Sequence, residues 1–575
     1  MYLLHDQLDT ATSMTSTYDF IVIGAGASGC VVASRLARTS SRPSVLLLEA
    51  GGSNETLEHL PAAERFNIAF SPGSSLNWHY KTTKQQQLRG QEIDYSRGKG
   101  LGGSTAINFC AWIVGSRDDY DEWAREVQDS SFGWENVKRC LKRIENLHPE
   151  IPDPRLRKYV RANVDGRQKT RTVLTGLTDH GNSGPVHLTY GDSWLPDLGD
   201  IFVAAEESGL KTNPDINSGD AIGMGMGSIC LYKGQRLTSS STYLAGSPDN
   251  LTVMPNASVS RITMKGSTAI GVETIKGEKF LAAKEVIVSG GAINTPQILM
   301  LSGLGPEEEL RKLQIPVVQH LPMVGRNLQD HCFSPIGIVM KEDETKSTNG
   351  GTQSPSPMGW FKLPSVLASP EYKMLESQKR DFLQRPTVPS YEIATHTPPS
   401  FLSHDVTPGT SFLGAIALVM NPQSTGTVDL RSTNPETAPS IDPKFLSHDY
   451  DRRVIIDSIR ETMRMLSAPV YAKRTIKMLG PENDSDEAIW NHVTKHLFSS
   501  WHMSCTARMG TSPDTACVDS DFRVFGVNNL RVVDLSTCPF VPNNHTQSTA
   551  YIVGEIAAEK IAKSYRLDES VQAYL

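Results

Sequence analysis

Two histidines late in the chain have side chains that could carry acid–base chemistry. His502 lies in the stretch SSWHMSC, and His545 follows 43 positions later in PFVPNNHTQS. An imidazole ring titrates near neutral pH, so it can take a proton from a substrate or return one. A buried histidine with satisfied hydrogen bonds would look the same in sequence. The two stretches alone therefore leave a catalytic base and a structural histidine both open.

A glycine-rich turn near the start of the chain points to a bound nucleotide. An apolar run, Phe20 to Ile23, is followed by the sequence GAGASG and then by residues with helical periodicity. This pattern predicts a strand, a tight turn and a helix whose N-terminus faces phosphate groups. Gly24 would permit the turn, Gly26 would let a pyrophosphate approach, and Gly29 would let the helix pack on the strand. Ala27 and Ser28 complete the expected phosphate loop.

A carboxylate at the expected distance supports this interpretation. A second apolar run, Val45 to Leu48, ends in Glu49, twenty residues beyond Gly29, and Ala50 follows. At this place an acidic side chain can hold ribose hydroxyls. It favours FAD or NAD, which have a free 2′-hydroxyl, over NADP.

Two further segments are bounded by glycines. The first, GKGLGGSTAINFCAWIVGSRDDYD, covers residues 98 to 121, and the second, GAINTPQILMLSGLG, covers residues 291 to 305 after an apolar run at 285 to 289. Glycines followed by small hydroxyl residues can bring backbone N–H groups against a flavin ring or its phosphates. Both segments are therefore predicted to be loops that approach a cofactor closely.

These two segments resemble the signatures of the glucose-methanol-choline (GMC) oxidoreductases, which are FAD-dependent. The resemblance extends to LLLEAGG at 46 to 52, NWHYKT at 77 to 82, VGRNLQDH at 324 to 331 and most of residues 500 to 562. The NNHTQ form around His545 is closest to aryl-alcohol oxidases and their fungal relatives. The middle of the chain matches weakly.

The resemblance implies a mixed α/β (α+β) fold with two domains. We expect a Rossmann-like FAD-binding domain from residues 18–150, 230–335 and 500–565. A substrate-binding domain, 151–229 and 336–499, would carry an antiparallel sheet flanked by helices. Apolar spacing predicts a packing helix over 549 to 564. The polar stretch 343 to 357 is predicted to be a surface loop, either shaping the entrance or an inert insertion.

The resemblance also implies a reaction. His502 and His545 fall where two family residues face the flavin N5, with a small-molecule alcohol between them. His502 would take the hydroxyl proton as hydride leaves the neighbouring carbon, and His545 would orient the hydroxyl. The flavin accepts the hydride, and oxygen or another electron acceptor would reoxidise it.

Further contacts follow from the same motifs. Cofactor contacts are expected at Gly98, Gly102, Gly103, Ser104, Asn108, Asp534, His545 and Thr546. Asp534 could instead form a turn, and Asn108 could cap a loop. Trp501 and Phe540 are expected to contact substrate, although such aromatic residues are as often core.

Four other positions are interpreted from the motifs. His331 is interpreted as a structural histidine. Ile107 stands where some relatives have a histidine bonded to FAD, so we predict non-covalent FAD. Cys505 and Cys538 have no evident base partner, which argues against a thiol nucleophile.

Composition excludes several other classes of function. Among 575 residues the net charge is −7 and basic residues are scattered, so nucleic-acid binding is not expected. No run of 18 apolar residues could span a membrane. The first residues, with Asp6 and Asp9, do not form a secretory signal, and we expect a cytoplasmic location. Eight cysteines without a CxxC pair argue against a metal site.

Two alternatives to alcohol oxidation stay open. Some GMC proteins are lyases or cyclases that keep FAD without net redox turnover, and the same histidine pair could act there as acid and base. An intracellular location would fit that chemistry in fungal secondary metabolism. A non-catalytic flavoprotein is the third possibility, and two histidines in register argue against it. Bleaching of the flavin by a substrate would discriminate oxidation from the others.

Overall fold

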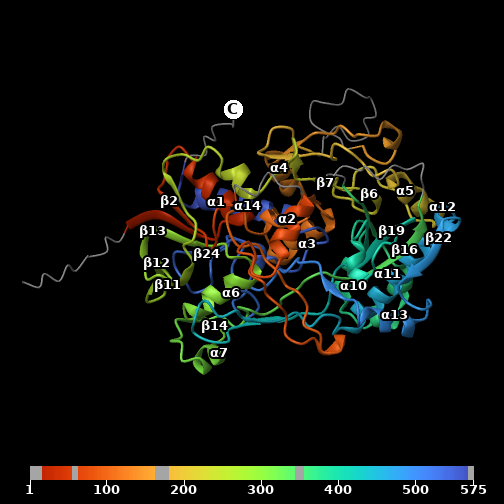
Figure 1. The fold of residues 1–575 in the computed structure, drawn as a ribbon. Helices are drawn as coiled ribbons and strands as arrows, with labels where there is room; N and C mark the ends of the chain where they lie inside the picture. The colour runs from red at the N-terminus through yellow and green to blue at the C-terminus, as the bar shows by residue number, and fades with distance from the viewer. Residues whose placement is uncertain (1–15, 55–61, 162–179, 343–354, 568–575) are drawn as a thin grey trace, which may run out of the picture.

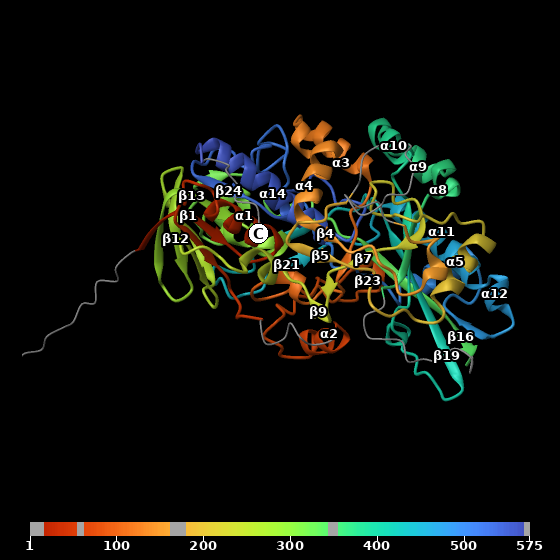
Figure 2. The same cartoon turned by 90° about the horizontal axis from the view of Figure 1, so that it is seen from above.

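The structure is a computed structural model that describes residues 16–54, 62–161, 180–342 and 355–567. Two seven-stranded sheets organise the described chain. They lie at opposite ends of the molecule in both views (Figures 1 and 2). Most of the polar stretch 343–357, including its predicted place at the entrance, lies outside the described residues.

The first sheet contains the predicted nucleotide-binding strands. Its parallel part consists of four neighbouring strands and a fifth that joins β13: β10 (Leu251–Met254), β2 (Val45–Leu48), β1 (Ser16–Ile23), β13 (Lys279–Val288) and β24 (Leu530–Val532). On its other edge it continues antiparallel through β12 (Thr268–Thr274) and β11 (Val259–Lys265). Both predicted apolar runs are buried strands, as expected where helices or loops cover both faces of a parallel sheet.

Two helices from opposite ends of the sequence pack together beside this sheet. They are α1 (Ala27–Ala37) and α14 (Gln547–Ser564), which begins two residues before the predicted helix. Gly554 allows the close approach, because a Cβ there would lie 2.7 Å from the Cβ of Val31. The N-terminal phosphate loop and the C-terminal segment after His545 are thereby held side by side.

The second sheet is antiparallel, as predicted for the substrate domain. Its spatial order is β22 (Thr475–Leu479), β16 (Cys332–Lys341), β19 (Thr410–Val419), β18 (Tyr391–Thr395), β17 (Pro357–Phe361) and β6 (Gly223–Met226), with β23 (Phe498–Ser499) also on β16. The helix α11 (Asp449–Leu466) packs on β16, β18 and β19. The predicted fold class is confirmed, whereas the domain boundaries stay a prediction.

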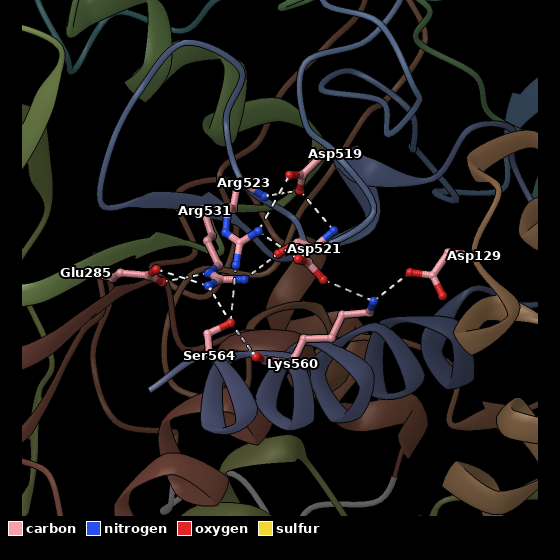
Figure 3. A network of polar contacts seen from close by, with 8 residues as sticks. All are labelled: Asp129, Glu285, Asp519, Asp521, Arg523, Arg531, Lys560 and Ser564. Atoms are coloured by element: carbon pink, nitrogen blue, oxygen red, sulfur yellow. Dashed lines mark hydrogen bonds and ion pairs between the residues drawn. The ribbon is translucent and has the colours of Figure 1, made fainter. Parts of the chain in front are cut away.

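A polar network fixes β24 to the rest of the first sheet and to α14 (Figure 3). Arg531 of β24 donates to both carboxylate oxygens of Glu285 on β13, at 2.7 and 3.1 Å. It also donates to the carbonyl of Asp521 and to Ser564 at the end of α14. Arg531 and Glu285 have side chains only 1% and 7% exposed, so this is a buried ion pair.

A second buried ionic group should make stability depend on pH. His180 lies between Glu145, at 2.9 Å, and Asp215, at 3.2 Å. Burial opposes its charge, but the two carboxylates prevail and hold the pKa of His180 well above its usual value. A raised histidine pKa stabilises the fold fully below about pH 6.5, and this stabilisation is lost as pH rises through the folded-state pKa.

We expect the wild-type protein to lose stability relative to a His180→Asn variant as pH rises above about 6.5, by about 1.4 kcal/mol per pH unit until the folded-state pKa is passed. Thermal unfolding of both proteins between pH 6 and pH 9 measures this difference. A constant gap between their midpoints would contradict the charged state assigned to His180.

None of the helices in the described ranges is long and apolar enough to cross a membrane.

Candidate active site

A cavity of about 780 Å³ collects residues from both sheets and from most of the predicted site. Its lining includes these predicted residues: Gly24, Gly26, Ala27, Ser28, Glu49, Ala50, Gly98, Gly103, Ser104, Asn108, Trp501, His502, Asp534, His545 and Thr546. Segments more than 500 positions apart in sequence therefore meet at one place.

Three predicted site residues lie outside this lining. Gly29 acts through packing, since a Cβ there would lie 2.0 Å from the carbonyl oxygen of Gly24. Gly102 adopts a positive φ of 92°, a backbone conformation that favours glycine. Phe540 packs its ring against Phe382, with centroids 5.6 Å apart, because its side chain turns toward the neighbouring helix instead of the cavity. The structure therefore does not bring Phe540 to the predicted substrate position.

The phosphate end of the cavity has the features of an anion site. Gly26 precedes the first turn of α1, and no side chain caps that helix end. A Cβ on Gly26 would meet nothing within 4 Å, so its backbone faces open space. The backbone of Gly103 approaches it closely, because a Cβ there would lie 2.8 Å from the Cα of Gly26. The loop at Gly26 thus leaves open backbone where a pyrophosphate needs N–H donors, whereas the N–H of Gly103 already donates to the carbonyl of Gly100.

Glu49 stands at the end of β2 on the cavity wall. Its carboxylate accepts hydrogen bonds from the backbone N–H groups of Ala25 and Gly51, both at 2.9 Å, and of Gly100 at 3.0 Å. Burial raises the pKa of Glu49, while these donors oppose that effect. The side chain is therefore held rigidly where ribose hydroxyls were predicted to bind.

Asp534 and Asn108 both line the cavity and shape the local backbone. Asp534 accepts from the N–H of Gly291 at 2.9 Å and from the hydroxyl of Thr295 at 2.6 Å. Asn108 accepts from the N–H of Cys110 at 3.0 Å, as a loop-capping amide would. Both residues therefore have a structural role and also line the cavity. Their contact with a cofactor stays a prediction.

The two predicted catalytic histidines lie next to each other on the lining of the cavity. Their ring centroids are 5.0 Å apart, with the ring planes inclined by 53°. The Nδ1 atom of His502 lies 2.8 Å from the hydroxyl of Ser500 and 3.0 Å from Nδ1 of His331. Both of these contacts are made by Nδ1, and no hydrogen bond of the Nε2 atom is found among the described residues. Burial, reinforced by the other two histidines and Arg97, holds the pKa of His502 well below its usual value.

The backbone around His502 is fixed by polar side chains. The N–H of His502 donates to Asp330 at 2.7 Å, and the same carboxylate accepts from Ser499 at 2.6 Å. Arg97 donates to the carbonyl of Trp501 at 2.5 Å. Trp501 has a positive φ of 57°, a strained conformation for such a large residue. These contacts hold the turn that presents the His502 ring to the cavity.

His331 is more than the structural histidine that its motif indicates. It is fully buried, as that interpretation requires, but its Nδ1 contacts the predicted catalytic ring directly. Its own Nε2 has no partner. Burial lowers the pKa of His331 to about 3, so this ring is neutral beside His502.

Glu392 is a site residue that the sequence did not indicate. It lies on β18, is fully buried, and its carboxylate is 2.8 Å from Nε2 of His545. The other carboxylate oxygen has no partner. No motif marks Glu392, because it lies in the weakly matching middle of the chain. Arg97 and Asp330, by contrast, lie beside or within quoted motifs, which mark these positions but not their contacts with the segment around His502.

This combination of a nucleotide-binding sheet, an antiparallel roof and a histidine pair is that of a known family. Residues 18–333 match the N-terminal GMC oxidoreductase family model and residues 422–554 match the C-terminal one. The chain belongs to the GMC oxidoreductase family.

Individual relatives agree over nearly the whole chain. The mitochondrial choline dehydrogenase of Mus musculus is 33% identical, over 97% of this chain and 91% of its own. A solved FAD-dependent oxidoreductase from Chaetomium thermophilum is 26% identical with a TM-score of 0.80, over 96% and 100% of the two chains. A fungal aryl-alcohol oxidase structure, 24% identical over 96% and 99%, has the same fold with a TM-score of 0.79.

GMC oxidoreductases bind FAD, and the residues present here fit it. The uncapped end of α1, the open face of Gly26 and the fixed carboxylate of Glu49 match the needs of its pyrophosphate and ribose. The chain is therefore an FAD-dependent oxidoreductase.

Proposed function

We propose that this protein oxidises an alcohol to the corresponding carbonyl compound. The proposal rests on the neighbouring pair His502 and His545 in the cavity that the predicted FAD-binding loops also line. The choline dehydrogenase and aryl-alcohol oxidase among its relatives are consistent with such a reaction.

His502 would take the hydroxyl proton. Its lowered pKa keeps the ring neutral at neutral pH, so one nitrogen has a free lone pair. Since Nδ1 is occupied by Ser500 and His331, a proton on Nδ1 leaves Nε2 to act as the base. When bound, FAD accepts the hydride that leaves the carbinol carbon.

His545 would orient the substrate hydroxyl. Its Nε2 is engaged by Glu392, so Nδ1 is the nitrogen available to the cavity. A ring that donates Nε2–H to this carboxylate presents the lone pair of Nδ1 to the cavity, where it can accept a hydrogen bond from the substrate hydroxyl and orient it. Glu392 acts through His545 and is a positioning residue.

The test is anaerobic mixing of the holoprotein with aryl, allylic and aliphatic alcohols while flavin absorbance is followed. Bleaching by any of them supports alcohol oxidation, and readmitting air then separates an oxidase from a dehydrogenase. If every alcohol leaves the flavin oxidised, the lyase or cyclase alternative replaces this proposal.

The cofactor is proposed to be dissociable. Ile107 lines the cavity at the position where some relatives attach FAD, and its side chain has no nucleophile. Denaturation followed by filtration should release all flavin into the filtrate, whereas retention on the protein would contradict the proposal. The cytoplasmic location and the role in secondary metabolism stay predictions.

Replacing Glu392 by Gln should slow flavin reduction about 10- to 100-fold at saturating alcohol. The amide keeps the size, but it can donate as well as accept, so it no longer fixes which nitrogen of His545 carries the proton. Stopped-flow reduction measures the rate. The exposed Glu376→Gln serves as the control and should leave the rate unchanged. An unchanged rate in Glu392→Gln would contradict the role of the pair.

A further inference from the structure

The roof of the cavity, on the second sheet, is apolar. Side chains from four neighbouring strands line it, and one more comes from the short helix η7 (Pro399–Leu402): Phe333, Met358, Ala394, Ile416, Leu418 and Phe401. Phe333 is directly opposite Leu418, and Ala394 pairs with both Ile416 and Met358. Cross-strand partners point to the same face of a sheet, so these side chains form one continuous surface. We call these six residues the apolar wall.

At one end of the apolar wall, aromatic rings pack against one another. Phe333 stacks on Phe498, with centroids 5.6 Å apart and planes inclined by 18°. Phe401 lies 5.7 Å from Phe333 and 5.0 Å from Phe498. Binding of a quaternary ammonium by aromatic rings needs free ring faces and is strongest with tryptophan. This cluster favours an apolar group over a cation.

The charged groups around the cavity do not favour a cation either. Among the described lining residues the only carboxylates are Glu49 and Asp534, and both hold backbone N–H groups at the nucleotide end. Glu392, on the same strand as Ala394, is engaged by His545 and does not line the cavity. Arg97 lines it and carries a positive charge.

We propose that the alcohol taken by this site is uncharged and presses an apolar group of tert-butyl to phenyl size against the apolar wall. A choline-like cation would be rejected, because a buried charge without a counter-charge is costly. This substrate class rests on the proposed function and distinguishes the chain from its relative of mouse mitochondria, a choline dehydrogenase.

A pair of alcohols with the same heavy-atom skeleton tests the charge alone. Choline and 3,3-dimethylbutan-1-ol differ at the branching atom, which is a cationic nitrogen in one and carbon in the other. We expect anaerobic flavin reduction of the holoprotein to favour the neutral alcohol at least ~100-fold in rate constant divided by dissociation constant. Equal or better reduction by choline would overturn the inference while upholding alcohol oxidation.

Binding provides a separate readout if neither alcohol reduces the flavin. The change of the flavin spectrum on titration then measures affinity without turnover. Tighter binding of the neutral alcohol, or of cinnamyl alcohol, over choline supports the apolar wall even though alcohol oxidation fails. Tighter binding of choline, or no binding of any apolar alcohol, overturns the inference.

A substitution in the apolar wall should shift the preference. Phe401 is partly exposed, so Phe401→Glu adds a carboxylate with less risk to folding than a change in a central strand. We expect it to lower the ratio in favour of the neutral alcohol at least ~10-fold, because the new carboxylate can pair with the ammonium. Phe401→Leu, the matched control, should leave the ratio within about threefold. An unchanged ratio in Phe401→Glu would exclude the apolar wall as the source of discrimination.

Discussion

Substituting His502 by Ala should leave FAD bound and slow flavin reduction by an alcohol about 10²–10⁴-fold, the usual contribution of a general base. The rate should fall because Nε2 of His502 is the nitrogen predicted to take the hydroxyl proton. Its Nδ1 already contacts Ser500 and His331. The fold should persist, since the backbone contacts through Asp330 and Arg97 do not involve the ring. Stopped-flow absorbance gives the rate, and the protein-bound flavin spectrum gives the occupancy.

Two controls identify the cause of that loss. Added imidazole should partly restore reduction in His502→Ala, because it can occupy the space of the missing ring. The exposed His320→Ala should leave the rate unchanged. A nearly normal rate in His502→Ala would refute its role as the base. If His545→Ala loses more than His502→Ala, the roles are exchanged, and the carboxylate of Glu392 behind His545 would explain why.

Local motifs correctly predicted the strand, turn and helix at the phosphate end of the cavity. The strand, turn and helix around Gly26 and the acidic residue after β2 depend on contacts between residues close in sequence. Their spacing therefore specifies their geometry, and the family resemblance placed both histidines at the same cavity. The same resemblance also predicted a Rossmann-like domain and a second domain with an antiparallel sheet.

Contacts between distant segments could not be predicted in this way. Glu392 meets His545 only because β18 crosses the roof above the C-terminal loop, 153 positions away in sequence. His331 and Asp330 lie in a recognised motif, yet nothing in their spacing shows that both contact the segment around His502. Phe540 illustrates the opposite case, since its proximity to His545 in sequence does not decide which way its side chain turns.

Replacing Arg531 by Met should destabilise the holoprotein by about 3–5 kcal/mol. Methionine fills much of the same volume, but it leaves the carboxylate of Glu285 buried without its counter-charge. It also removes the donors to the Asp521 carbonyl and to Ser564, which connect β24 to the end of α14 (Figure 3). Denaturant unfolding followed by tryptophan fluorescence measures the loss.

The same network offers a matched control. Arg523 is also an arginine of this cluster and pairs with Asp521 at 2.7 Å, but its side chain is 47% exposed. Arg523→Met should therefore cost no more than about 1 kcal/mol, as exposed ion pairs do. A similar loss in both variants would show that burial of the Arg531 pair is not the cause.

The double variant Arg531→Met with Glu285→Leu separates the value of the ion pair from the penalty of an unpaired charge. Removing both charges leaves apolar groups between β13 and β24, and buried pairs replaced in this way are often as stable as the original. We expect the double variant to recover most of the stability lost in Arg531→Met. Such recovery would mean that the pair mainly fixes the position of β24, and through it Asp534, which follows two residues later on the wall of the cavity. No recovery would instead assign the stability to the donors that Arg531 supplies to Asp521 and Ser564.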